Sequence, residues 1–186
     1  LALLDALNIE LVHWVGLSMG GMIGQNLALR APERLLSLSL CDTIGKVPDE
    51  AQSVWRDRIA AVRSNGMEGV VEATLQRWFT EDYLSQDPAP VKLIRQYILS
   101  TPITGFIGCC EAIRGLNYLD QLNTVNLSTL VIVGEQDAGT PVAASEAMHA
   151  QLPNSELVIL PNASHLSNVE QADAFSTALV KFLQSV

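Results

Sequence analysis

The segment Leu11–Gly21 constrains this chain more than any other, because an apolar run ends there in glycines that flank a single serine. Gly16-x-Ser18-x-Gly20 is the nucleophile-elbow pattern, in which small neighbours let the backbone turn sharply and push the serine hydroxyl clear of a sheet. The apolar run before it is typical of a buried strand, and Met22–Arg30 after it is typical of a helix. Ser18 is therefore the candidate nucleophile.

The same turn predicts where a developing negative charge could be stabilised. Met19 follows Ser18 at a helix N-terminus, where unpaired N–H groups and the helix dipole favour an oxyanion. Its backbone amide is therefore the candidate for one half of an oxyanion hole. A G-x-S-x-G pattern also arises by chance, and Ser18 would then be a helix cap behind a glycine turn. The strand before the motif and the helix after it favour the functional interpretation.

The composition favours one α/β domain. The 186 residues fit a single domain of ordinary size, with room for an inserted subdomain. The hydrophobic content of 48% suits strands that are buried on both faces. We therefore predict a mostly parallel sheet with helices on both of its faces.

Charge and cysteine content exclude several classes of partner. The 11 basic and 20 acidic residues give a net charge of −9, and no basic stripe could neutralise phosphates, so we expect no nucleic acid. No apolar run is long enough to span a membrane. The three cysteines, two of them adjacent at Cys109-Cys110, match neither a disulfide framework nor a metal-ligand spacing. They predict buried thiols in a reducing compartment such as the cytoplasm.

The apolar runs divide the chain into three segments. Residues 1–46, a core segment with the elbow, contain strand-like runs at Leu11–Val15 and Leu35–Cys41. Over residues 47–119 such runs disappear, which predicts an inserted helical cap with helices at Pro48–Ser64, Met67–Phe79, Pro88–Ser100 and Pro102–Arg114. Residues 120–186 return to the core pattern, with strands at Thr129–Gly134 and Glu156–Leu160 and helices at Val142–Leu152 and Val169–Gln184. Strands that alternate with helices predict a parallel sheet.

A serine nucleophile needs a base, and the chain has three histidines. His13 lies in the strand before the elbow, where we expect its side chain in or beside the core. His149 falls in a helix of surface character, where we expect it to be solvated. His165 follows the strand Glu156–Leu160 through a short loop, at the sheet edge where sites form in open α/β folds. We therefore predict His165 as the general base.

The base needs an acid to orient it, and the loop after the strand Thr129–Gly134 offers two. Both Glu135 and Asp137 could reach the histidine. Asp137 is the stronger candidate, because it lies deeper in the loop and near the carboxyl edge of the strand. The order serine, aspartate, histidine is also the chain order that nucleophile-elbow hydrolases use. Glu135 is the fallback, and the alternative interpretation of Asp137 is a turn residue or helix cap.

Four stretches together carry a resemblance to a family. The chain resembles the C-terminal two thirds of an α/β-hydrolase and, within that superfamily, the 3-oxoadipate enol-lactonases. The matching stretches are Gly16-Leu17-Ser18-Met19-Gly20-Gly21, Arg77-Trp78-Phe79-Thr80, Gly108-Cys109-Cys110-Glu111-Ala112-Ile113 and Ser164-His165-Leu166-Ser167-Asn168. The two stretches in the cap are the more specific.

The resemblance implies a Ser-His-Asp hydrolase of the β-ketoadipate pathway of aromatic degradation, with no metal or organic cofactor. Its substrate would be a small enol-lactone with a free carboxylate, opened through an acyl-enzyme. Because such a substrate is anionic, Arg77 is the candidate for carboxylate recognition, with Trp78 as an apolar wall. Surface solvation is the alternative for Arg77. Fold and triad do not fix a substrate, so a general carboxylesterase, a perhydrolase, a C–C bond hydrolase and a catalytically silent remnant that acts as a binding module remain alternatives.

The start of the chain departs from the family pattern. Leu1 is not an initiator methionine, Leu1–Glu10 resembles the end of an amphipathic helix, and no basic leader of a signal peptide precedes an apolar stretch. The strands that precede the elbow in the family are absent, together with the early loop that supplies the second oxyanion donor. We therefore predict an unpaired edge at residues 11–15, covered by a separate N-terminal segment or by a second copy of the chain in a homodimer.

Overall fold

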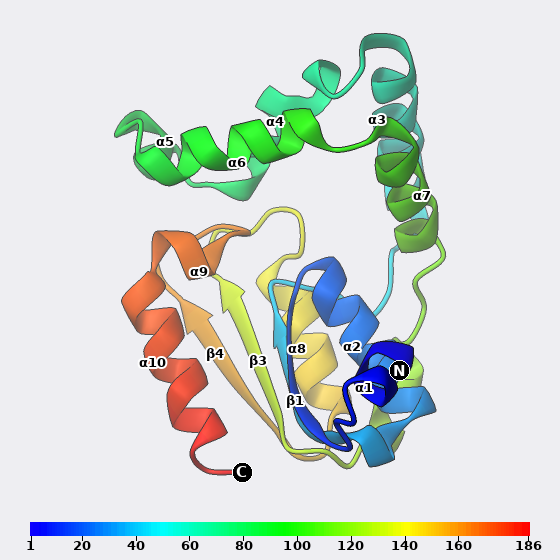
Figure 1. Cartoon of the computed structure of the whole chain (residues 1–186). Coiled ribbons are helices and arrows are strands. Elements are labelled where there is room, and N and C mark those ends of the chain that lie inside the picture. Colours follow the sequence, from blue (N-terminus) through cyan, green and yellow to red (C-terminus); the bar gives the residue numbers. More distant parts are fainter.

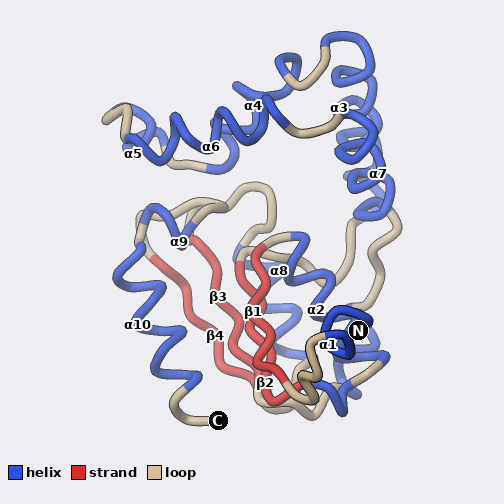
Figure 2. Tube along the Cα trace, viewed as in Figure 1, coloured by secondary structure: helices blue, strands red, loops and turns tan.

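A computed structural model describes all residues from Leu1 to Val186. Its centre is a four-stranded parallel sheet (Figure 2). The strands lie in the order β1-β2-β3-β4, so that β1 is an edge strand. The strands are β1 (Val12–Leu17), β2 (Leu35–Cys41), β3 (Thr129–Gly134) and β4 (Ser155–Leu160). The predicted α/β class and parallel sheet are confirmed.

Helices cover both faces of the sheet (Figure 1). Alternate residues of β3 point to opposite faces, as the pleat requires. Val131 packs in a cluster with Ala28 of α2 (Met19–Arg30) and Met148 of α8 (Val142–Gln151). Leu130 and Ile132 pack in a second cluster with side chains of α10 (Ala172–Leu183). All six residues of β3 are buried, which explains why its sequence is an unbroken apolar run.

Five helices between β2 and β3 form a separate layer above the end of the sheet where the β3 and β4 arrows point (Figure 1). They are α3 (Gln52–Asn65), α4 (Glu68–Trp78), α5 (Glu81–Ser85), α6 (Ala89–Ser100) and α7 (Ile103–Arg114). The chain enters and leaves this layer at one point, because Lys46 and Asn117 form an antiparallel bridge. We call the layer the cap.

The cap has its own apolar cluster, which also touches the sheet domain. Val62, Leu75 and Phe79 are almost fully buried within it. Leu166 and Val169, which follow β4, pack against the same cluster. The cap is thus fixed to the loop that carries His165 by apolar contacts.

Some elements differ from the sequence prediction. Helix α2 begins at Met19, directly after the serine, and α5 was not predicted. The helix expected over Val169–Gln184 is two helices, α9 (Ser167–Glu170) and α10, because Gln171 between them has φ −123° and ψ 51°. Shorter elements are α1 (Ala2–Ala6) and the 3-10 turns η1 (Pro32–Arg34), η2 (Asp49–Ala51) and η3 (Leu119–Thr124).

The expectation that His13 lies in or beside the core needs correction. Its side chain is exposed, and its Nδ1 lies 2.8 Å from Ser37 Oγ. The reason is that β1 is an edge strand, so this part of its surface is open.

Among the helices of the structure, none combines the length and apolar composition needed to cross a bilayer.

Candidate active site

The elbow holds Ser18 in a backbone conformation that side chains rarely adopt. Ser18 lies between β1 and α2 with φ 52° and ψ −114°, and such strain often marks a functional position. A Cβ on Gly16 would meet the carbonyl oxygen of Gly20 at 2.2 Å, so only glycine fits there. Thr43 Oγ1 donates to the Ser18 carbonyl at 2.7 Å and braces the turn. A Cβ on Gly20 would meet no atom within 4 Å, so the second glycine of the motif is not sterically required.

The structure brings three predicted residues together from three strand ends. His165 Nε2 lies 2.9 Å from Ser18 Oγ, and His165 Nδ1 lies 2.7 Å from Asp137 Oδ2. His165 is 6% exposed and Asp137 is 3% exposed, whereas Ser18 opens to a cavity. With Nδ1 donating to the carboxylate, Nε2 is left free to accept the serine proton.

Asp137 is stabilised in its charged form. Burial alone would raise the pKa of Asp137, but the hydrogen bond and charge of His165, together with hydrogen bonds from Thr140, lower it overall. Oδ1 accepts from the backbone N–H groups of Gly139 and Thr140 at 2.8 and 2.9 Å, and Thr140 Oγ1 donates to Oδ2 at 2.5 Å. The Asp137 side chain therefore also fits the turn-residue interpretation, because it accepts from the two backbone N–H groups of the turn that follows it. Glu135, the fallback acid, is exposed and makes no contact with His165.

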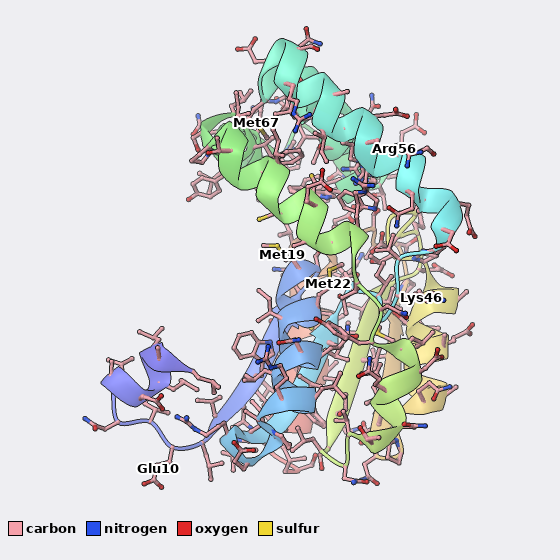
Figure 3. All side chains as sticks on the ribbon, turned by 90° about the vertical axis from the view of Figure 1, so that its right-hand side faces the viewer. Glu10, Met19, Met22, Lys46, Arg56 and Met67 are labelled. Atoms are coloured by element: carbon pink, nitrogen blue, oxygen red, sulfur yellow. The ribbon has the colours of Figure 1, made fainter.

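The start of α2 presents the backbone amide that the sequence predicts as an oxyanion donor. Met19 is the first residue of α2, so its N–H has no acceptor in a preceding turn. Figure 3 labels Met19 and Met22 at the end of α2 that faces the cap, and both line the cavity over Ser18. The backbone N–H of Met19 is thereby available to a group bound at Ser18.

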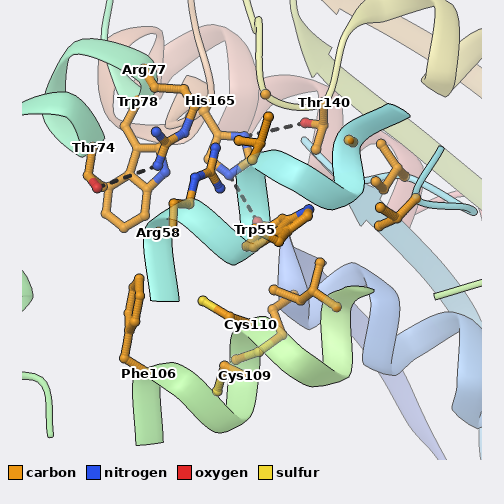
Figure 4. A pocket seen from close by; sticks show the side chains of 18 of the residues that line it. Trp55, Arg58, Thr74, Arg77, Trp78, Phe106, Cys109, Cys110, Thr140 and His165 are labelled. Carbon is orange, nitrogen blue, oxygen red and sulfur yellow. Dashed lines mark hydrogen bonds between the residues drawn. The ribbon is translucent and has the colours of Figure 1, made fainter. Parts of the chain in front are cut away.

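The cap residues Arg77 and Trp78 both line this cavity, which has a volume of about 630 Å³. The Trp78 ring stacks on the His165 ring with centroids 6.1 Å apart. Arg77 is half-buried, and burial, followed by the charge of Arg58, lowers its pKa to about 10. Figure 4 shows Arg77 and Trp78 beside His165 on one side of the cavity.

Hydrogen bonds fix this part of the cap to the histidine loop. Glu170 Oε1 accepts from Thr80 N and Thr80 Oγ1 at 2.8 and 2.7 Å, and Glu170 Oε2 accepts from Ser164 N at 2.6 Å. The backbone N–H of Leu166 donates to the Trp78 carbonyl at 3.0 Å. The Glu170 carboxylate and the Trp78 carbonyl therefore tie the end of α4 and the residues just after it to the two neighbours of His165, Ser164 and Leu166.

Two residues near the site were missed in the sequence. Arg58 of α3 lines the cavity, with its guanidinium 4.5 Å from the centre of the Trp55 ring. Asp42, directly after β2, is fully buried beneath the site, and burial raises its pKa to about 7. Arg58 resembled an ordinary helix-surface charge in sequence. Asp42 carried one signal, its place at the carboxyl end of a buried strand.

The comparisons with known proteins agree on a family. A family model described as alpha/beta hydrolase fold matches residues 1–172. The chain is 36% identical to 3-oxoadipate enol-lactonase 2 of Acinetobacter baylyi over 96% of its own length and 66% of that protein. The enol-lactonase from Burkholderia xenovorans LB400 superposes with a TM-score of 0.93 at 34% identity, covering 98% of this chain and 68% of that chain.

A third relative is a thermophilic esterase from Thermogutta terrifontis, solved with malate bound. It superposes with a TM-score of 0.91 at 31% identity, covering 98% of this chain and 68% of that chain. The chain therefore spans about two thirds of the length of each of these relatives.

Proposed function

This chain belongs to the α/β-hydrolase fold family, and we propose that it hydrolyses a small ester or lactone with Ser18 as the nucleophile. His165 is the general base and Asp137 is the acid that orients it. The observation that carries the proposal is the contact chain from Ser18 Oγ through both nitrogens of the His165 ring to Asp137 Oδ2, with distances of 2.9 and 2.7 Å. A serine at a strained elbow beside a carboxylate-paired histidine suits acyl transfer.

In the proposed reaction His165 Nε2 takes the Ser18 proton while Oγ attacks the substrate carbonyl carbon. The Met19 N–H donates to the resulting oxyanion. Collapse of the tetrahedral intermediate breaks the bond to the leaving oxygen, which receives the proton from His165 and leaves an acyl-serine. Water, deprotonated by His165, then attacks the acyl carbon. The bond to Ser18 Oγ breaks, His165 returns the proton to Oγ, and the acid is released. Asp137 stabilises the imidazolium that forms in each step.

The proposed substrate is a small enol-lactone with a free carboxylate, such as 3-oxoadipate enol-lactone, which would open to 3-oxoadipate. Arg77 is the proposed carboxylate contact, and Trp78 is the apolar wall beside it. The names of the A. baylyi and B. xenovorans relatives support this choice.

A carboxylesterase is the second candidate, and the T. terrifontis esterase favours it. The relative turnover of two substrates distinguishes the two candidate functions. A lactonase should open the enol-lactone with a kcat/KM well above that for a short neutral nitrophenyl ester, and an esterase should reverse this order. Each assay compares two preparations at the same protein concentration. One is the 186-residue chain, and the other also contains any further segment of the same protein.

The nucleophile is tested by Ser18→Ala, with Ser100→Ala on the exposed end of α6 as the control. We expect Ser18→Ala to reduce kcat on the order of a thousandfold or more, and the control to keep full activity. Comparable turnover by both variants would mean that another group is the nucleophile. An active-site serine reagent should label the wild type and the control but not Ser18→Ala.

A further inference from the structure

The cavity wall carries basic side chains and no acidic ones. Twenty-five residues line the cavity, and none is an aspartate or glutamate. This is notable because acidic residues outnumber basic ones by 20 to 11 in the chain. The charged groups are Arg58 from α3 and Arg77 from α4, together with the titratable His165. Charge in an otherwise apolar cavity indicates what the cavity binds.

Neither arginine forms a salt bridge with an acidic side chain, although the charge of Asp137 acts on Arg77 and opposes the lowering of its pKa. The arginines in ion pairs are Arg34, Arg95 and Arg114. Arg58 is instead held over the Trp55 ring at 4.5 Å. Arg77 donates only two long hydrogen bonds, to Ala73 O at 3.3 Å and Thr74 Oγ1 at 3.4 Å. Both guanidinium groups therefore keep donors free for a ligand.

The two arginines also repel each other. Figure 4 shows their guanidinium groups side by side, close to His165. Burial is the larger cause of the lowered pKa of Arg77, and the positive charge of Arg58 is the next. Like charges held together in a partly dry cavity are unfavourable until an anion lies between them. The arrangement is thus complementary to a negative group.

We propose that Arg58 and Arg77 together bind one carboxylate of the ligand, so that Arg58 is a specificity-determining residue of this cavity. The inference rests on the proposed function. The ligand class is a short ester or lactone with a free carboxylate on its acyl part, whose carbonyl reaches Ser18. Trp55 holds the Arg58 guanidinium by its ring face, and Trp78, which follows Arg77 in the chain, stacks on the His165 ring.

Binding without turnover gives the first test. Adipate is titrated by calorimetry into the wild type, Arg58→Met, Arg77→Met and the control Arg56→Met. Arg56 lies on the same helix but is exposed and does not line the cavity (Figure 3). We expect each cavity variant to weaken adipate binding by at least about tenfold and the control by less than about twofold. Wild-type affinity in Arg58→Met, or equal affinity of the wild type for dimethyl adipate, overturns the proposal.

A matched pair of substrates gives the second test. The mono-4-nitrophenyl ester of succinic acid and 4-nitrophenyl butyrate share a leaving group and an acyl length, and only the first has a carboxylate. Arg58→Met should lower kcat/KM at least about tenfold for the succinyl ester and less than about twofold for the butyrate. Equal losses on both substrates overturn the role of Arg58. Adipate binding without turnover of either ester would instead contradict the proposed hydrolase and leave the anion site intact.

Discussion

Ser167 Oγ donates a 2.5 Å hydrogen bond to Asp42 Oδ2, which joins the end of β2 to the first turn after His165. The other oxygen of Asp42 accepts from the backbone N–H of Gly134 at 2.9 Å, where β3 leads into the loop of Asp137. A single fully buried carboxylate therefore contacts both of the segments that carry the acid and the base. The protonation state of Asp42 should therefore affect the stability of the folded chain.

We predict that Asp42 makes the folded state less stable as pH rises. Burial raises its pKa from 3.8 to about 7, against hydrogen bonds from Ser167 and Gly134 that lower it. The folded chain thus binds this proton more tightly than the unfolded chain does. The stabilisation is complete below pH 3.8 and is lost as pH rises to about 7.

The variant Asp42→Asn removes the titration while keeping an acceptor for Gly134 and a donor for Ser167. Asparagine also tolerates the φ of 44° at this position. The free energy of unfolding of Asp42→Asn relative to wild type should increase by on the order of 1 kcal/mol or more between pH 5 and pH 8. Denaturant titrations at both pH values measure it, with the exposed Asp57→Asn as control. A difference that does not change with pH would show that Asp42 is ionised throughout.

Glu170 is predicted to couple the cap to the catalytic loop. Its carboxylate accepts three hydrogen bonds, two from Thr80 and one from Ser164. In Glu170→Gln one oxygen becomes an amide donor that faces other donors, which should cost about 1–3 kcal/mol of stability. The kcat should fall together with stability because Ser164 precedes His165. The exposed Glu135→Gln is the control. Equal losses of stability and kcat in the two variants would contradict this role of Glu170.

The two glycines that flank Ser18 should respond in opposite ways. In Gly16→Ala the new methyl group would lie 2.2 Å from the Gly20 oxygen, whereas in Gly20→Ala it meets nothing within 4 Å. We expect Gly16→Ala to destabilise the chain by at least about 2 kcal/mol. Gly20→Ala should be neutral or stabilising by up to about 1 kcal/mol, because alanine is favoured in a helix. Thermal unfolding of both variants tests this prediction. A similar loss of stability in each would contradict the close contact at Gly16.

Local patterns were enough to predict the sheet. The bounds of β2 and β3 match the apolar runs, because strands buried on both faces need no tertiary information to be recognised. Ser18, Asp137 and His165 could be named because each follows a strand, and parallel strands end at one edge. Their roles stay a proposal, although their side chains meet in the structure.

Residues whose importance comes from a distant partner could not be predicted. Arg58 is separated by many residues from His165, with which it lines the same cavity, and in sequence it is one more charge on a helix. Glu170 contacts Thr80 across 90 positions, a pairing that no spacing rule indicates. The break at Gln171 was missed because the apolar period of the last helix continues through it.

The edge of β1 carries the last prediction. β1 pairs only with β2, so its other side presents free N–H and C=O groups. Leu11 is 46% exposed and Val15 is 44% exposed, and residues 11–17 include neither of the residues, lysine and proline, that protect natural edges. We propose that this edge is covered by another polypeptide, a separate N-terminal segment or a second copy. In a solution of the 186-residue chain alone the occupant is a second copy.

Sedimentation analysis and hydrogen exchange test this edge together. We expect the chain to associate and the amides of residues 11–15 to exchange slowly in the associated form. Val15→Lys should shift the chain toward monomer by adding a charge to the edge, whereas the control Val180→Lys, on the equally exposed face of α10, should not. A wild-type monomer whose amides at residues 11–15 exchange quickly would contradict the proposal, because a bare apolar edge would then be stable in water.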